Sequence, residues 1–260
     1  MKTHDFLLEL GTEELPPKLL LRLSSALKDN LSSELEKLHI DFDIVKAFAT
    51  PRRLAITISA IQSKQQDQII EKKGPSTQSP EMAISGFAKS CGVNIDDLEK
   101  KEQRGKEYYY FSKEQTGQNI SDLLPLIIEK SIKNIPITRA MRWGSSDYSF
   151  VRPVHWLVVM LDKDIVSANI MGLKSNRVTK GLRFQNSNIE LLHAKDYEQC
   201  MSDEAQILVD FAKRKELIRD QVLSVAQKNN AEVVIDESLL DEVCALVEYP
   251  RAFSGGFDKK

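Results

Sequence analysis

Three arginines and two tryptophans lie close together in the stretch TRAMRWGSSDYSFVRPVHWLVVML. Arg139, Arg142 and Arg152 offer planar guanidinium groups, which pair with phosphates or carboxylates through two parallel hydrogen bonds. The same groups stack on aromatic rings, which Trp143 and Trp156 supply. These residue types suit the binding of a polyanion, but they also suit protein interfaces and buried ion pairs. The residues alone leave both interpretations open.

Two further stretches are basic, namely TPRR and KSNRVTKGLRF, the second of which has no acid between its charges. The whole chain has a net charge of −2 and a pI near 6.2, so it is not a basic nucleic-acid-binding domain and any polyanion site must be a local patch. A single basic residue is most often a solvated surface charge. As a group, the candidate binding residues are Arg52, Arg53, Arg139, Arg142, Arg152, Arg177, Lys180 and Arg183.

Catalytic and metal-binding motifs are absent from the sequence. It contains no Gly-rich phosphate loop, no nucleophile elbow and no zinc-protease motif. Glu13 and Glu14 follow a strand and could form an acid–base pair, but acids also stabilise a helix start. His155 is expected at a strand end rather than as a ligand. The three cysteines lack CxxC spacing, which predicts reduced, structural thiols and neither disulfides nor a metal site.

The elements that must position these residues begin with a β-α-β-β order over the first sixty residues. The run DFLLEL predicts a buried strand, and leucines at three- and four-residue spacing after Pro16 and Pro17 predict an amphipathic helix. FDIVKAFAT predicts a second strand. In RRLAITISAIQ apolar residues recur with period two, which predicts a half-buried third strand.

The rest of the chain predicts further alternation of helices and strands. Helices are expected at 79–92, at 119–135, from Ala212 and from Glu237, the first of them capped by Ser79. Strands are expected at YYYF, VHWLVVML, DKDIVSANIM, AQILVDF and EVVID, with VHWLVVML and DKDIVSANIM forming a central pair. The fold class is therefore α/β or α+β, with mixed sheets and packed helices.

Composition predicts a soluble globular protein with one large or two smaller domains. The chain has 260 residues, of which 42% are hydrophobic and 28% charged, and it is long enough to bury a substantial core. No apolar run could cross a membrane and the N-terminus does not resemble a signal peptide, so we expect a cytoplasmic protein. The polar stretch 63–79 predicts a linker between two subdomains, 1–62 and 80–260.

Six blocks of sequence, in order and spread over the chain, resemble the beta subunit of bacterial glycyl-tRNA synthetase. They are LLELGTEELPPKLL, FATPRRLAI, GFAKSCGV, MRWG with FVRPVHWLVVML, TKGLRF and VEYPRAFSGGFD. One position departs from this pattern, since Leu182 stands where many relatives have histidine, which argues against an essential imidazole there. The resemblance implies a class II aminoacyl-tRNA synthetase, a ligase that attaches glycine to its tRNA in protein biosynthesis and consumes ATP.

The same resemblance implies which functions belong to the alpha subunit and which to the beta subunit. The family forms a heterotetramer of two alpha and two beta chains, with the glycine, ATP and Mg²⁺ site in the alpha subunit and no cofactor on this region. Its partners would be the alpha subunit and tRNA(Gly), not DNA or a membrane. The chain resembles an N-terminal fragment that lacks the family's HD-like and anticodon-binding domains. Its fold would resemble the B3/B4 module of the phenylalanyl-tRNA synthetase beta chain.

Three hypotheses about the role of the region follow. The leading one is a tRNA-binding and subunit-assembly region without an active site of its own. The alternative is a purely structural alpha–beta interface in which the arginines hold the architecture. A third, an editing-like hydrolase, rests on analogy with the B3/B4 module alone. Whether the arginines face solvent or pair with carboxylates decides between the first two.

Overall fold

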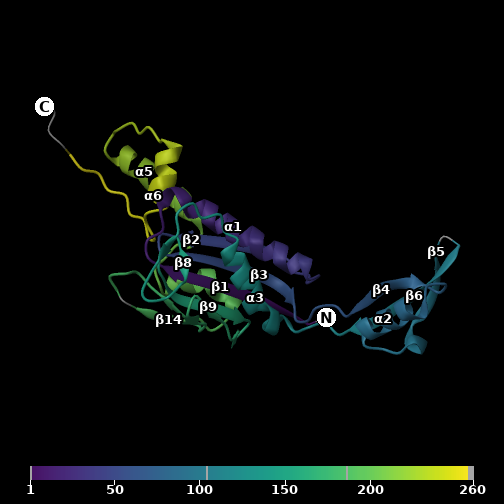
Figure 1. Cartoon of the computed structure of the whole chain (residues 1–260). Helices are drawn as coiled ribbons and strands as arrows, with labels where there is room; N and C mark the ends of the chain where they lie inside the picture. Colours follow the sequence, from purple (N-terminus) through teal and green to yellow (C-terminus); the bar gives the residue numbers. More distant parts are fainter. Residues whose placement is uncertain (1, 104, 186, 257–260) are drawn as a thin grey trace. The chain divides into compact units, whose positions relative to one another are not determined.

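The computed structural model describes residues 2–103, 105–185 and 187–256. The chain forms two compact units, which we describe separately (Figure 1). The main unit contains the residues up to Ser63 and those from Asn119 on, and the inserted unit contains Lys64–Gln118. None of the described helices is both long and apolar enough to cross a membrane.

A five-stranded antiparallel sheet forms the centre of the main unit, in the order β10-β9-β1-β3-β2. Its strands are β1 (Thr3–Thr12), β2 (Val45–Thr50), β3 (Arg53–Gln62), β9 (Val154–Leu161) and β10 (Asp164–Ile165). From Phe6 to Thr12 every residue of β1 is buried, because the strand has neighbours on both sides and layers on both faces. The runs DFLLEL and VHWLVVML are thus neighbouring core strands, as a continuous apolar run predicts.

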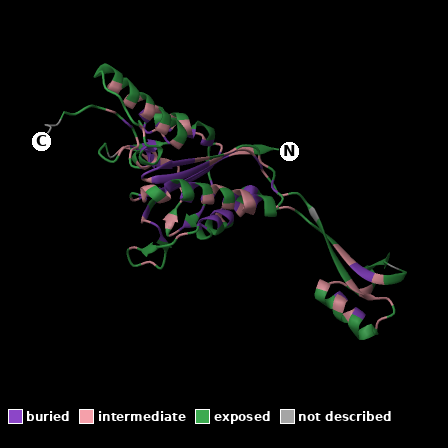
Figure 2. Ribbon diagram, turned by 90° about the horizontal axis from the view of Figure 1, so that it is seen from above, coloured by how far each residue is buried: buried purple, intermediate pink, exposed green. Residues whose placement is uncertain are grey.

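Two helices cover one face of this sheet, namely α1 (Pro17–Lys37) and α3 (Ile120–Lys133). Helix α1 begins at Pro17 with Pro16 as its N-cap, and its leucine stripe is buried at Leu20, Leu23, Leu27, Leu31 and Leu35. The predicted amphipathic helix is therefore confirmed. Figure 2 shows the buried strands of the sheet and the exposed outer sides of the helices.

Shorter elements cover the opposite face, which we call the second face. They are β13 (Val178–Lys180), β14 (Asn188–Glu190), the 3₁₀ turn η2 (Ala194–Asp196) and α4 (Tyr197–Asp203). Leu7, Phe48, Ala55 and Val158 of the sheet pack there against residues of this layer, including Tyr197. Strand β3 is consequently buried on both faces over its first half, so the prediction of a half-buried strand was wrong there.

Helices α5 (Phe211–Lys228) and α6 (Glu237–Cys244) end the main unit and confirm the two predicted helices. Their anchor is Arg214 of α5, which is fully buried. It donates hydrogen bonds to the carbonyls of Ala49 (2.7 Å), Cys244 (3.1 Å) and Leu208. One side chain thereby ties α5 to β2, to α6 and to the segment before α5.

Two strand predictions in the main unit were wrong, and a third holds only in part. AQILVDF alternates because Ala205, Ile207 and Val209 are buried in the second-face core, yet the segment forms no strand. EVVID also forms no strand, and its Val234 is exposed. The expected pairing of β9 with DKDIVSANIM is present but short: β9 pairs with the edge strand β10 at Asp164 and Ile165, and its longer partner in the sheet is β1.

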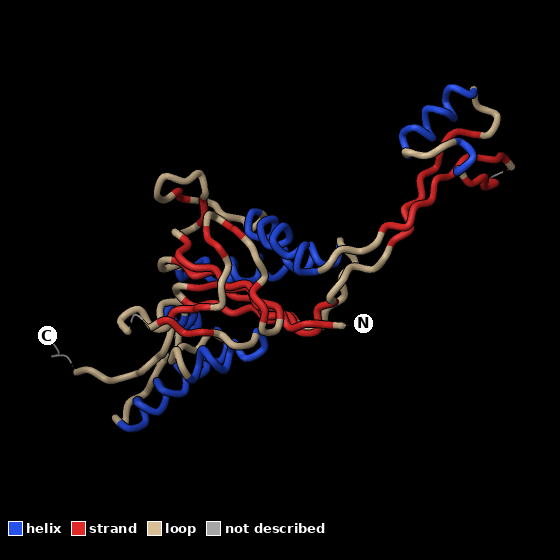
Figure 3. The backbone as a smooth tube through the Cα atoms, turned by 90° about the horizontal axis from the view of Figure 1, so that it is seen from below, coloured by secondary structure: helices blue, strands red, loops and turns tan. Residues whose placement is uncertain are grey.

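Two small antiparallel ladders complete the main unit, one between β7 (Met141–Arg142) and β8 (Ser149–Phe150) and one between β11 (Asn169–Ile170) and β12 (Leu173–Lys174). The tube in Figure 3 shows these short strands together with the long ones. All of the strand ladders among the described residues are antiparallel. The mixed fold of helices and sheets is therefore confirmed, while the B3/B4 likeness stays a prediction.

The inserted unit is a three-stranded antiparallel sheet with the order β4-β6-β5. Its elements are β4 (Gln68–Ser76), α2 (Glu81–Cys91), the 3₁₀ turn η1 (Ile95–Asp97), β5 (Glu99–Gln103) and β6 (Lys106–Gln115). Ile84 and Ala88 of α2 pack on Tyr109 of β6. The predicted YYYF strand and the helix ending at Gly92 are confirmed, although the N-cap is Pro80 rather than Ser79.

The chain is divided differently from the sequence prediction. Most of the expected linker at 63–79 is strand β4, whose polar composition reflects its place at the edge of a sheet. Residues 1–62 do not stand apart from 80–260 either, because β1 pairs with β9 along most of its length. The segment that separates is 64–118.

Candidate functional site

Four segments that are distant in sequence meet at one end of the main sheet. Gly11 of β1 pairs with Arg53 of β3 on one side and with Trp156 of β9 on the other. The backbone continues this contact, since Thr12 N–H donates to the Arg52 carbonyl at 2.8 Å. Strand β13 covers the same end from the second face. We call the group the Trp156 cluster: Glu9, Gly11, Thr12, Glu13, Glu14, Arg52, Arg53, Arg152, His155, Trp156, Thr179, Lys180 and Arg183.

Glycine at position 11 makes room for the indole of Trp156. A Cβ atom at Gly11 would lie 1.8 Å from two carbons of the ring, far inside van der Waals contact. The ring is buried, with only 5% of the residue exposed. Any larger residue at position 11 would have to displace it, so the close approach of the β1 backbone fixes where the indole lies.

Three cationic side chains surround this indole. The Cζ atoms of Arg52 and Arg53 both lie 5.8 Å from the ring centroid, and Lys180 Nζ lies 5.6 Å from it. Cations within about 6 Å of a tryptophan ring are attracted by its electron-rich face. Basic side chains from the β2–β3 turn, from the start of β3 and from β13 therefore meet at Trp156.

Glu9 provides the negative charge beneath the ring. Its carboxylate is fully buried and accepts hydrogen bonds from Trp156 Nε1, Thr179 Oγ1 and Tyr197 OH, each at 2.5 Å. Burial and the neighbouring Glu9 charge both raise the pKa of Tyr197, so its phenol stays protonated and donates. Since these three donors satisfy its oxygens, Glu9 serves as a buried acceptor around which the cluster is built.

Arg53 is the cation that belongs to the core. It is fully buried, its Nη1 lies 3.8 Å from Glu9 Oε2, and its Nη2 lies 3.4 Å from Glu248 Oε1. It also donates from Nη2 to the Lys180 carbonyl at 2.9 Å. Burial by itself would lower the pKa of Arg53, but Glu9 and Glu248 outweigh it and hold that pKa above its ordinary value. Because its side chain has no exposed surface, the expectation that Arg53 contacts tRNA is not met.

The remaining charged groups lie at the edge of the cluster. Arg183 Nη1 lies 3.2 Å from Glu14 Oε1 and 3.8 Å from Glu13 Oε2, and His155 Nε2 lies 3.1 Å from Glu13 Oε1. Arg152 donates to the carbonyls of Glu14 and of its own neighbour Val151. Glu13 and Glu14, the acid–base candidates of the sequence, are therefore ion-pair partners of basic residues.

Residues 6–260 match the sequence profile of the family described as glycyl-tRNA synthetase beta subunit. The chain belongs to this family. It is 43% identical over 265 residues to the glycine–tRNA ligase beta subunit of Coxiella burnetii (strain RSA 493 / Nine Mile phase I), an alignment covering 99% of this chain and 38% of the relative. The beta subunits of Chromohalobacter salexigens and Hahella chejuensis are 41% and 39% identical over the whole chain, and both are covered to 39%. The chain thus spans about two fifths of the length of these relatives.

The Trp156 cluster is built from blocks by which the sequence resembles the glycyl-tRNA synthetase beta subunit family. Of the eight candidate residues it brings together Arg52, Arg53, Arg152, Lys180 and Arg183. The other three lie elsewhere. Arg139 and Arg142 are exposed, with Arg142 Nη1 3.4 Å from Asp147 Oδ1, and Arg177 donates to the Lys163 carbonyl at 2.8 Å. Arg142 and Arg152 begin and end one hairpin segment but have different partners.

Glu9, Tyr197 and Glu248 belong to this site but were not among the residues predicted from the sequence. A signal for Glu9 was present, because a charged residue inside the apolar run DFLLEL needs partners if the strand is buried. Tyr197 and Glu248 carry no such signal, since only the tertiary fold brings α4 and the segment after α6 to this point. Lone titratable residues far along the chain cannot be paired by spacing.

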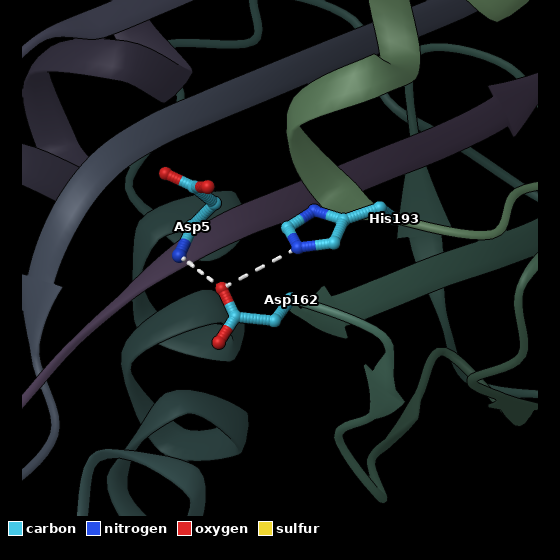
Figure 4. Close-up of side chains that lie close together, drawn as sticks. All are labelled: Asp5, Asp162 and His193. Atoms are coloured by element: carbon cyan, nitrogen blue, oxygen red, sulfur yellow. Dashed lines mark hydrogen bonds and ion pairs between the residues drawn. The ribbon is translucent and has the colours of Figure 1, made fainter.

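A second polar group, at the opposite end of the sheet, contains Asp5, Asp162 and His193 (Figure 4). Asp162 Oδ1 accepts from Asp5 N–H at 2.7 Å and lies 4.0 Å from His193 Nε2, and Asp162 Oδ2 lies 2.7 Å from His4 Nδ1. His193 Nδ1 accepts from Lys195 N–H at 3.3 Å, so its proton is on Nε2, where a metal would need a lone pair. The group therefore fits hydrogen bonding better than metal ligation.

Proposed function

We propose that this chain is part of a glycine–tRNA ligase, which joins glycine to tRNA(Gly) with consumption of ATP. The support is its membership of the glycyl-tRNA synthetase beta subunit family over residues 6–260 and the ligase names of its relatives. Within that enzyme, we assign the region a role in tRNA binding and subunit assembly. The observation that carries the tRNA role is the pair of cations Arg52 and Lys180 beside Trp156.

Arg52 and Lys180 differ from most cations of the chain in their surroundings. Both are half-buried, and neither has a carboxylate within ion-pair distance among the described residues. In addition, Arg52 Nε is buried and has no hydrogen-bond partner within the part of the chain that the structure describes. Unpaired cations held against an aromatic ring keep their capacity to bind an anion. In a tRNA ligase, the anion that these cations would bind is a phosphate of the tRNA backbone.

In this proposal, a partner subunit supplies the site for ATP and Mg²⁺. We propose a partner alpha subunit in a heterotetramer of two alpha and two beta chains in the cytoplasm, with ATP and Mg²⁺ bound by the alpha subunit. In this chain the group around Asp162 does not offer Mg²⁺ an oxygen cage, because His193 faces Asp162 with its N–H.

A purely structural role is the second candidate, and the buried pairs favour it. Arg53 is neutralised by Glu9 and Glu248, and Arg183 by Glu13 and Glu14. If all of the cluster's cations acted in this way, the cluster would stabilise the fold or an interface with the alpha subunit. The arrangement does not support an editing hydrolase, since both candidate acids, Glu13 and Glu14, are ion-paired with Arg183.

Binding of a tRNA(Gly) transcript to the 260-residue chain tests the proposal. Fluorescence anisotropy in about 50 mM and about 200 mM salt should show binding that weakens steeply with salt, as phosphate contacts require. Arg52→Glu and Lys180→Glu should each weaken binding at least tenfold, while a single-stranded DNA of equal length should bind more weakly than the tRNA. Unchanged affinity for both variants, together with weakened capture of the alpha subunit, would establish the structural alternative instead.

A further inference from the structure

Phe184 is a fully exposed aromatic residue at the turn between β13 and β14, beside the Trp156 cluster. Its relative exposure is 100%, against 5% for Trp156. An aromatic side chain usually buries much of its surface, so a phenylalanine with this exposure is available for a partner. The turn carries Arg183 directly before it.

The turn that presents Phe184 is held by contacts on both of its sides. Gln185 N–H donates to the Leu182 carbonyl at 3.0 Å, and Gly181 N–H donates to the Ser187 carbonyl at 3.0 Å. Leu182 packs against the second-face core, and Gln185 Nε2 donates to Gln206 Oε1 at 3.3 Å. These contacts hold Leu182 and Gln185, which lie on either side of Phe184 in the sequence.

The turn begins at Lys180, whose carbonyl is held by the buried Arg53. Lys180 and Arg52 beside Trp156, and Arg152 at the edge of the cluster, have no carboxylate within ion-pair distance among the described residues. Counted with Arg183, the edge of the cluster carries four basic side chains against Glu13 and Glu14, although the whole chain is acidic by two charges. An exposed aromatic ring on a turn that begins at an unneutralised cation matches a nucleotide, which has a flat apolar base and an anionic phosphate.

We propose that Phe184 stacks on an unpaired base of an RNA strand whose phosphates are bound by Arg52 and Lys180. The inference rests on the proposed function and deepens it, because it names an unpaired segment of the tRNA as the ligand. Paired bases in an RNA helix have no free face for a protruding ring, whereas unpaired bases do. The neighbouring cations favour RNA over an apolar protein partner.

Four variants of the 260-residue chain separate the possibilities, with a tRNA(Gly) transcript as the probe. Phe184→Ala should lower affinity by about fivefold or more, in line with the stacking contribution of one base. Phe184→Trp should restore wild-type affinity, and Phe184→Leu should behave like Phe184→Ala because leucine keeps apolar surface but has no ring. Phe253→Ala is the matched control, since Phe253 is also exposed (89%) but lies in the C-terminal segment, and its affinity should equal that of the wild type.

A second probe, an RNA hairpin duplex with a minimal tetraloop, completes the test. Its affinity should be unchanged by Phe184→Ala but lowered by the double variant Arg52→Ala/Lys180→Ala. The inference is overturned if Phe184→Ala binds the tRNA as tightly as wild type, or if Phe184→Leu does, which would show that ring stacking on a base does not contribute to the affinity. If the double variant also leaves tRNA affinity unchanged, the proposed function fails as well. Thermal melts of all variants exclude loss of fold, which a fully exposed position is not expected to cause.

Discussion

Glu9 and Trp156 are joined by a buried hydrogen bond in which the indole Nε1 donates to Glu9 Oε1 at 2.5 Å, across 147 positions of sequence. The bond lies between neighbouring strands at the end of the main sheet where the basic blocks meet. Since Glu9 also lies near Arg53 and accepts from Tyr197, one carboxylate links the strands to the layer on the second face. Among the cations around Trp156, Arg53 lies beside this buried carboxylate and in turn holds the carbonyl of Lys180.

Replacing Glu9 should destabilise the main unit strongly. Glu9→Gln removes the charge opposite Arg53, which leaves the fully buried guanidinium with Glu248 alone. Removing one partner of a buried ion pair costs about 3–5 kcal/mol. Urea denaturation should show a loss of this size, whereas Glu36→Gln on the exposed side of α1 should change the free energy of unfolding by less than about 0.5 kcal/mol. A loss below about 1 kcal/mol for Glu9→Gln would contradict the role assigned to the carboxylate.

A methyl group at position 11 should also be costly. Gly11→Ala places Cβ within the space of the Trp156 ring, and overpacking of this kind costs about 1–3 kcal/mol. Near-ultraviolet circular dichroism should report a changed environment of the indole, and denaturation should report the lost stability. In the inserted unit, Gly86→Ala is the control, because nothing lies within 4 Å of a Cβ at that helical position. It should be neutral or stabilising by up to about 1 kcal/mol, and equal behaviour of the two variants would refute the close approach.

Removal of the Arg214 side-chain charge should loosen the C-terminal helices before the rest of the unit. Arg214→Met keeps the apolar stem but leaves three carbonyl groups without their donor, a cost of about 1–3 kcal/mol for each unsatisfied group. Hydrogen exchange should become faster in α5 and α6 than in β1 and β9. Arg219→Met, on the same helix and paired with Glu237 at the surface, should leave exchange nearly unchanged. Uniformly faster exchange over the whole unit would argue against a local anchor.

Lowering the pH should reduce the free energy of unfolding through protonation of Asp162. Burial alone would raise the pKa of this carboxyl group, but the Asp5 N–H and the nearby His4 outweigh it and lower the pKa below its ordinary value. Ionised Asp162 therefore stabilises the folded state fully above the unfolded-state pKa of about 3.9, and this contribution disappears as the pH falls through the lower folded-state pKa. The free energy of unfolding should fall less steeply below about pH 4 in Asp162→Asn than in the wild type. Asp164→Asn, at an exposed neighbouring position, should keep the wild-type slope, and identical slopes for all three proteins would contradict the assignment.

Helices and strands were predicted best where an element is buried along one face only or along all of its faces. The leucine spacing of α1 and the apolar runs of β1 and β9 each bury the residues that their patterns indicate. Strand β4 was missed because an edge strand with polar side chains has the composition of a loop. The segment 205–209 alternates like a strand because alternate residues are buried, although no ladder forms.

The site could be predicted only in part, and the neighbours Arg52 and Arg53 show why. Successive side chains of an extended chain point in opposite directions, so one of two adjacent arginines can be buried while the other reaches the surface. The sequence marks both as candidates but does not say which is which, because that depends on whether Glu9 and Glu248 reach the same place. The structure buries Arg53 and leaves Arg52 half-exposed.

The salt dependence of tRNA(Gly) binding tests most directly whether the cluster holds RNA. The logarithm of the binding constant should be measured against the logarithm of salt concentration for the wild type and for Arg52→Ala/Lys180→Ala. An Arg22→Ala/Lys133→Ala control removes the same charges from exposed positions of the helices on the opposite face. If Arg52 and Lys180 contact phosphates, the cluster variant should lose about one to two units of slope and the control should lose none. Equal slopes for wild type and cluster variant would contradict the account.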